Sequence, residues 1–139
     1  MDNKETMLAD LERLWPQSSG FFRVPEDVEN GVGEEIGGVI VEDHDEDDML
    51  TLSLVKTRRA MEGLGFGSRM LDTICRLADQ HGVALYIEIA PAGRLSEEDL
   101  TKWYAKRGFE SLENQIFARE GHAMERSPRP VPDLAPVSI

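Results

Sequence analysis

Cysteine is almost absent from this sequence. The 139 residues include one cysteine, Cys75, so the chain can form neither an intramolecular disulfide nor a cysteine-rich metal site. Cys75 lies in the segment Leu-Asp-Thr-Ile-Cys-Arg-Leu at 71–77, which has the pattern of a helix face. We therefore interpret it as a buried, inert thiol rather than a nucleophile.

Basic side chains are also scarce. The sequence has 15 Lys and Arg against 27 Asp and Glu, which gives a formal net charge of -12. Proteins that bind the phosphate backbone of nucleic acids usually present a clustered basic surface, so we expect no nucleic-acid partner. The acidic excess fits a cationic substrate, or simply a soluble surface.

Long apolar runs and metal-ligand patterns are missing as well. No run approaches the roughly 20 residues that span a bilayer, and the charged N-terminus is not followed by a signal-type apolar core. The sequence thus predicts a cytoplasmic protein without a membrane contact. The acidic run 43–48 alternates like a calcium loop, but Asp48 replaces the glycine needed at position six and Leu54 stands at position twelve. The histidines form no ligand pattern, so we expect no metal.

What the sequence does contain is an alternation of strand and helix patterns over the length of one domain. Hydrophobic residues make up 40%, enough for one core. The expected helices span 5–15, 68–81 and 96–108, the expected strands span 21–24, 36–41, 50–55, 83–90, 109–112 and 115–118, and 26–35 is expected to be a loop. An antiparallel hairpin followed by strand-helix-strand units predicts an α/β fold with a mixed sheet.

The C-terminal residues have a different composition. We expect one domain over residues 1–121 and a proline-rich, flexible tail over 122–139. The alternative is an extended arm laid on a neighbouring copy, which would make the protein a homodimer.

A glycine-rich turn carries the clearest chemical signal. Residues 62–68, Glu-Gly-Leu-Gly-Phe-Gly-Ser, follow a predicted strand and lead directly into a predicted helix. Glycines let backbone N–H groups approach a ligand, and the N–H groups of a helix start point at an anion, so a pyrophosphate is the natural guest. A plain packing turn is the alternative. The dinucleotide-binding pattern fails because Ser68 stands at the third glycine, and the P-loop Gly-Lys-Ser/Thr is absent.

Two segments in the right order resemble the GCN5-related N-acetyltransferase (GNAT) family. Residues 63–71, Gly-Leu-Gly-Phe-Gly-Ser-Arg-Met-Leu, are similar to its acetyl-CoA signature. Residues 103–109, Trp-Tyr-Ala-Lys-Arg-Gly-Phe, are similar to its Tyr-x-x-x-Gly-Phe element, and the strand at 85–89 lies between them. The resemblance covers about residues 36–120.

This resemblance implies a splayed, V-shaped sheet that holds acetyl-CoA between the strands ending near Val55 and beginning at Leu85. Pantetheine would lie on the first strand and the pyrophosphate on the turn. The implied cofactor-binding residues are Leu54, Val55, Lys56, Thr57, Arg58, Arg59, Gly63, Leu64, Gly65, Phe66, Gly67 and Ser68. Tyr104 matches the residue that protonates the departing CoA thiolate in many members, and a nearby O–H donor does stabilise such a leaving group.

Three features depart from the family pattern. Glu62 stands where Arg or Gln is usual, although Arg58 and Arg59 lie just upstream. Pro-Ala-Gly-Arg at 91–94 replaces the asparagine often found after the third main strand. The N-terminal part, which usually builds the acceptor pocket, is shortened.

Glu88, mid-strand beside the splay, and Glu42, at the end of the preceding hairpin strand, are candidates for the general base. The alternative interpretation is that both are ordinary acids on the wet face of a sheet.

Together the motifs predict an acetyl-CoA-dependent N-acetyltransferase, in which a primary amine of a small molecule or a lysine attacks directly in a ternary complex. Two other classes stay open. A catalytically idle acyl-CoA-binding or structural module is suggested by Glu62 and the short N-terminal part, and an acidic interaction protein by the charge of -12.

Overall fold

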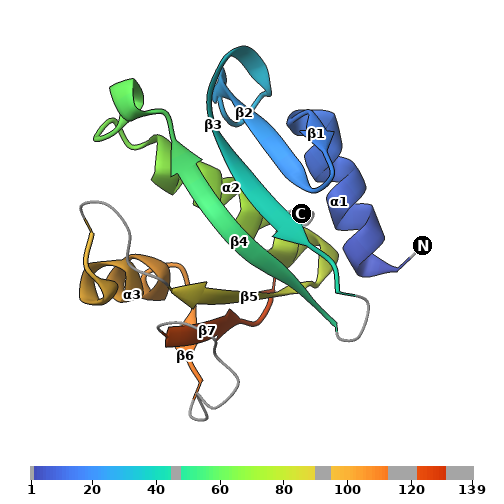
Figure 1. Ribbon diagram of the computed structural model, residues 1–139. Helices are drawn as coiled ribbons and strands as arrows, with labels where there is room; N and C mark the ends of the chain where they lie inside the picture. The colour runs from blue at the N-terminus through green and yellow to red at the C-terminus, as the bar shows by residue number, and fades with distance from the viewer. Residues whose placement is uncertain (1, 45–47, 90–94, 113–121, 131–139) are drawn as a thin grey trace, which may run out of the picture.

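The computed structural model describes residues 2–44, 48–89, 95–112 and 122–130 (Figure 1). The elements follow one another as α1 (Asn3–Leu14), β1 (Gln17–Ser18), β2 (Phe21–Asp27), β3 (Val32–Glu42), β4 (Met49–Thr57), the 3-10 helix η1 (Arg59–Met61), α2 (Phe66–His81), β5 (Ala84–Ile89), α3 (Glu97–Ala105), β6 (Glu110–Ser111) and β7 (His122–Arg126).

The strands form one mixed sheet in the order β1-β2-β3-β4-β5-β7-β6. β4 and β5 are parallel and are joined by the crossover through α2, whereas the other neighbouring pairs are antiparallel. The predicted α/β class with a mixed sheet is confirmed, and so is the antiparallel hairpin formed by β3 and β4.

The hydrophobic core lies between this sheet and its helices. Figure 1 shows α1 and α2 behind the sheet, and the two helices contact each other. Apolar residues recur along α2 with the period of a helix, so one stripe faces the sheet. The fully buried side chains of the two helices are Met7, Leu11, Trp15, Met70, Leu71, Ile74 and Ala78.

Polar contacts fix the N-terminal helix to the rest of the chain. Lys4 Nζ lies 2.7 Å from an Asp43 carboxylate oxygen, and His81 Nε2 lies 2.6 Å from Asp10. The indole of Trp15 donates a 2.9 Å hydrogen bond to the carbonyl of Val28 inside the core. These contacts hold α1 against the sheet beside α2.

The expected loop at 26–35 is wrong over most of its length. β2 continues through Pro25 to Asp27, and β3 already begins at Val32. The pairing register shifts on both sides of Pro25, and such irregular pairing accommodates a residue that has no N–H to donate. The Asp27 carboxylate accepts from the N–H of Asn30 at 3.2 Å, which closes a tight turn between the strands.

Residues 122–126 do not belong to a tail. They form β7, which pairs with β5 along five residues and with β6 on its other side. Ala123 and Met124 are buried in the core, and Arg126 makes two hydrogen bonds to Asp79 of α2, at 2.8 and 3.0 Å. The strand expected at 115–118 lies outside the described residues, as do 131–139 of the expected tail.

None of the helices in the described part of the chain is long and apolar enough to cross a membrane. Within the same ranges, no three His, Cys, Asp or Glu side chains are grouped so that they could hold a metal ion. Residues 45–47 of the acidic run are outside these ranges.

The Arg126–Asp79 pair yields a test of the C-terminal strand. Arg126 is 2% exposed, so Asp79→Asn should leave a buried charge without a counter-ion and lower the free energy of unfolding by about 3–5 kcal/mol. Glu98→Gln is the matched control, because Glu98 pairs at 3.1 Å with Lys102 on the exposed face of α3 and should cost about 0–0.5 kcal/mol. Urea unfolding at pH 7 measures both.

Acid should remove the same stabilisation. Burial acts to raise the pKa of Asp79, but the hydrogen bonds from Arg126 and from the Arg129 N–H, together with the charges of both arginines, outweigh it, and the pKa is lowered from the ordinary 3.8. A carboxyl whose pKa is lowered by folding stabilises the fold above its unfolded pKa and loses that contribution as the pH falls through its folded pKa. The difference between parent and Asn variant should therefore shrink below about pH 4. Equal stability of the two proteins at pH 7 would contradict the assignment.

Candidate active site

The sheet splits between β4 and β5. Their pairing joins Met49, Leu50 and Thr51 to residues 84–86 and goes no further. Beyond Thr51, β4 continues beside β3 to Thr57, while β5 continues beside β7 to Ile89. Each strand thus keeps one partner and the edge between them opens, so the sheet is splayed as the sequence predicted.

A β-bulge coincides with the split. Ile40 pairs with Leu54 and Val41 with Leu52, which leaves Ser53 without an opposite residue. A bulge bends its strand and increases the local twist, so it turns the end of β4 away from β5. Ser53 Oγ donates a 2.7 Å hydrogen bond to the carboxylate of Glu42 at the end of β3.

The open edge of β4 presents backbone groups. The N–H of Arg58 bonds to the carbonyl of Ile36 at 2.7 Å, which sets the alternation along the strand. Arg58 and Lys56 turn their backbone groups to β3, and Thr57 and Val55 turn theirs to the open edge. An extended ligand that carries amide groups can add to such an edge as a further strand would.

The glycine-rich turn begins the next helix. Gly63 and Gly65 have φ of +80° and +86°, a conformation that favours glycine, and a Cβ at either would meet nothing within 4 Å. Gly65 caps α2 without a side-chain bond, and no described residue accepts from the N–H of Phe66, Gly67 or Ser68. Three donors at the positive end of the helix dipole therefore have no acceptor among the described residues, which suits an anion.

Trp103, the residue before Tyr104, contacts the start of α2. Trp103 Nε1 donates a 3.0 Å hydrogen bond to Ser68 Oγ, which places α3 against the first turn of α2. The Tyr104 ring stands edge-on to Trp103 and Phe109, with centroids 4.9 and 5.3 Å away. Burial raises the pKa of Tyr104 to about 12, so the phenol keeps its proton at neutral pH.

Solved structures share this fold. No protein-family model and no curated protein matches the chain. Tetrahymena GCN5 is similar with a TM-score of 0.54 and 13% identity, over 94% of this chain and 92% of that one. N-acetylglutamate synthase from Neisseria gonorrhoeae, complexed with coenzyme A, gives 0.55 and 20%, over 89% of this chain and 32% of that one. The anti-CRISPR protein AcrVA5 gives 0.54 and 23%, over 69% and 95%.

This chain has the GNAT fold. In that fold the residues expected to bind acetyl-CoA, at 54–59 and 63–68, form one continuous path from the end of β4 through η1 to the start of α2. The structure thus brings them together beside the split, although they come from a strand, a 3-10 helix, a turn and a helix.

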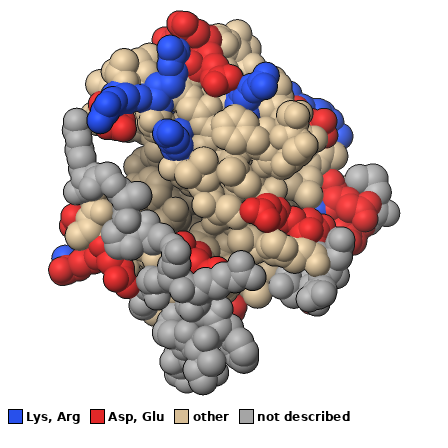
Figure 2. All heavy atoms as spheres, in the orientation of Figure 1, with Lys and Arg blue, Asp and Glu red and all other residues tan. Residues whose placement is uncertain are grey.

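The cations near this path are not equivalent. Figure 2 shows Lys and Arg side chains gathered above a hollow in the surface. Arg58 is turned aside, since it donates to the carbonyl of Glu35 at 3.0 Å and lies 3.8 Å from the Glu34 carboxylate. Lys56 and Arg59 are exposed and make no ion pair with any residue in the described ranges. Of the three cations, Lys56 and Arg59 thus differ from Arg58, which other residues already engage.

The two predicted acids lie on the sheet face opposite α1 and α2. Glu42 pairs with Thr51, and Thr51 pairs with Tyr86, so the three side chains share this face at the last row before the split. Glu88 is exposed two residues further along β5, in the part of that strand that has left β4. Glu88 therefore lies at the opening, whereas Glu42 lies at its closed end and is engaged by Ser53.

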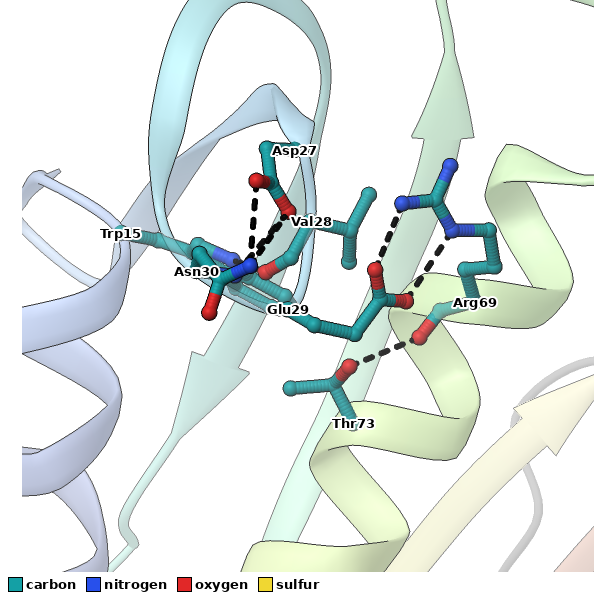
Figure 3. A network of polar contacts seen from close by, with 7 residues as sticks. All are labelled: Trp15, Asp27, Val28, Glu29, Asn30, Arg69 and Thr73. Carbon is teal, nitrogen blue, oxygen red and sulfur yellow. Dashed lines mark hydrogen bonds and ion pairs between the residues drawn. The ribbon is translucent and has the colours of Figure 1, made fainter.

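The sequence did not predict one ion pair next to the site, between Arg69 and Glu29. Figure 3 shows Arg69 of α2 facing Glu29 of the β2–β3 turn; Nε lies 3.0 Å from Oε2, and the hydrogen bond lowers the pKa of Glu29. The pair anchors the first turn of α2 to the hairpin that Trp15 holds through Val28. Forty residues separate the partners, so no local pattern could indicate the contact.

If the turn holds the pyrophosphate of CoA, as the sequence predicts, Gly65→Ala should weaken CoA binding by roughly tenfold or more, since its Cβ enters the space in which the donors converge. Gly82→Ala is the matched control: Gly82 ends the same helix with φ of +68°, and its Cβ would meet its nearest atom at 3.7 Å. Both variants bear similar backbone strain, about 1–2 kcal/mol. Calorimetry with CoA should show a loss for Gly65→Ala alone, and equal affinities would refute the phosphate site.

Proposed function

We propose that this protein is an acetyl-CoA-dependent N-acetyltransferase, in which a primary amine attacks the acetyl group directly in a ternary complex. One observation carries the proposal: the free backbone donors of the α2 start and of the open β4 edge border the same split in the sheet. The first set suits a pyrophosphate and the second suits the amides of a pantetheine arm. A single extended thioester would use both.

The chain's own residues fit this ligand. Val55 and Thr57 offer backbone N–H and C=O groups to the arm, and residues 66–68 offer N–H groups to the phosphates. Lys56 and Arg59 add positive charge at the same end of β4. When bound, acetyl-CoA supplies the acetyl thioester; the protein binds it, orients it and handles the protons.

Tyr104 is the group proposed to stabilise the leaving sulfur. Its pKa of about 12 lies above the ~8.5 of a cysteine thiol, so complete proton transfer to an alkyl thiolate would be uphill. The phenol therefore acts as an O–H donor to the developing negative charge, and solvent completes the protonation. A hydrogen bond to a charged acceptor is stronger than one to a neutral acceptor. The bond from Tyr104 therefore stabilises the transition state, in which the C–S bond breaks and the sulfur gains negative charge.

Glu88 is the group proposed to take the proton from the amine. An amine is protonated at neutral pH and must lose a proton before its nitrogen bonds to the acetyl carbon. Glu88 is exposed on the part of β5 that borders the split. Burial is the main cause that raises the pKa of the nearby Tyr86, and the negative charge of Glu88 adds to it. The carboxylates on this sheet face favour a cationic acceptor, either a small-molecule amine or a lysine.

A CoA-binding module without turnover is the second candidate. Its supporting observation is Glu62, which places a carboxylate next to the turn where the GNAT signature usually has a cation or an amide. CoA binding without transfer to any of a panel of amines would favour this candidate over the enzyme.

Tyr104→Phe tests the role of the phenol. The change keeps the ring between Trp103 and Phe109 and removes the O–H, so stability and CoA affinity should stay the same while kcat falls roughly 10²-fold, the lower end of the range for acid-base assistance. The loss should be smaller with acyl donors whose leaving thiol is more acidic. Tyr86→Phe, the other tyrosine, is the control and should keep its rate.

The pH profile adds a second measurement for the same variant. A group with a pKa of about 12 stays protonated through the neutral and moderately alkaline range, so the ratio of parent to variant rate should be constant from about pH 7 to pH 10. Full activity of Tyr104→Phe, or a loss that appears in Tyr86→Phe instead, would show that another group assists the thiolate.

Glu88→Gln and Glu42→Gln form a matched pair for the base. Glu88→Gln should lower kcat roughly 10²-fold, since an amide cannot accept the proton, while KM for acetyl-CoA stays the same. Glu42→Gln should change kcat little, because Glu42 already accepts from Ser53. The reverse ranking, measured with one amine at saturating acetyl-CoA, would assign the base to Glu42.

A further inference from the structure

Trp103 makes a contact that the proposed reaction does not itself require. Its indole Nε1 lies 3.0 Å from Ser68 Oγ, in a partly buried position where α3 meets the first turn of α2. Its Cζ2 atom would also lie 3.7 Å from a Cβ added at Gly67. The indole therefore borders two of the three residues whose N–H groups are free at the start of α2.

The chemistry of the two groups sets the direction of this bond. An indole N–H can only donate, whereas a serine hydroxyl has one proton and two lone pairs. Ser68 Oγ must therefore accept from Trp103, and its own proton is left to donate elsewhere. No residue in the described ranges accepts that proton.

The indole is itself held in place. The guanidinium of Arg107 lies 5.1 Å from the centroid of the Trp103 ring and donates to the Trp103 carbonyl at 2.9 Å. Arg107 Nε is in turn 2.8 Å from the carboxylate of Asp72, one turn of α2 beyond Ser68. α2 thus grips Trp103 at both Ser68 and, through Arg107, at Asp72, so the N–H has little freedom to turn away.

We infer that Trp103 is a positioning residue for the phosphate site: its N–H occupies one lone pair of Ser68 Oγ and directs the hydroxyl proton toward the anion bound at the start of α2. The inference rests on the proposed function, because the anion in question is the pyrophosphate of acetyl-CoA. Ser68 then binds through its hydroxyl as well as its backbone N–H. The same hydrogen bond links the binding of acetyl-CoA to α3, the helix that carries Tyr104.

A double-mutant cycle on CoA affinity tests this inference. Ser68→Ala removes a hydrogen bond to a charged group and should weaken CoA binding roughly 10- to 100-fold. Trp103→Phe keeps an aromatic ring without the N–H and should weaken it roughly 3- to 10-fold. In the Ser68→Ala background the Trp103 substitution should have no further effect, because the hydroxyl on which it acts is gone. A merely structural role would weaken binding equally in both backgrounds.

Two controls separate the N–H from the bulk of the ring. Benzothienylalanine at position 103 keeps the bicyclic shape and lacks the N–H, so it should reproduce the loss seen with Phe. Trp15→Phe removes the other indole donor, which bonds to Val28 in the core, and should lower thermal stability while CoA affinity stays the same.

The outcomes are distinct. Equal losses in both Ser68 backgrounds, or parental affinity of the benzothienylalanine protein, would overturn the positioning role and leave the proposed function in place. Failure of the unmodified protein to bind CoA would overturn the proposed function and this inference with it.

Discussion

The pairing of β4 with β5 stops after three residue pairs, and the rest of the site depends on that stop. Each strand stays in the sheet because its other edge remains paired, β4 with β3 and β5 with β7. The bulge at Ser53 supplies the bend that separates them. Backbone groups that would have joined the two strands are left without a strand partner, and the chain leaving β4 must turn at that place to enter α2.

The start of α2 is held from several sides, which keeps its free N–H groups in one arrangement. Arg69 is anchored by Glu29 of the β2–β3 turn, and Ser68 is engaged by Trp103 of α3. Further along the helix, Asp79 is bound by Arg126 of β7. Each tie comes from a different part of the chain. A binding site that is rigid before its ligand arrives loses less conformational entropy on binding, so this bracing serves recognition as well as stability.

The charge of the protein and the charge of its proposed ligand have the same sign. A net charge of -12 repels an anion at long range, so binding has to come from short-range donors. The backbone N–H groups at the start of α2 carry no net charge yet suit the proposed phosphate, and Lys56 and Arg59 stand at the same end of β4. Glu42 and Glu88 lie on the same face of the sheet and suit the cationic acceptor of the proposed reaction. One acidic chain can thus offer one site that suits an anion and another that suits a cation, because the groups within a few ångströms of each site determine which charge it binds.

Local signals in the sequence determined the hairpin of β3 and β4, the C-terminal end of α2 and the start of α3, whereas α2 begins at Phe66, two residues before the expected start. Gly65 precedes the first residue of α2 and Gly82 follows its last, and each adopts a positive φ. The capping box formed by Ser96 and Asp99 starts α3. Tertiary structure alone decided that Pro25 lies inside a strand, that residues 122–126 complete the sheet, and that Glu88 rather than Glu42 borders the split. It also engaged Arg58 with the carbonyl of Glu35, and brought Trp103 to Ser68 across 35 residues. Propensity, capping and periodicity act over a few residues, whereas these outcomes depend on partners far away in the chain, which only the packed sheet and helices bring together.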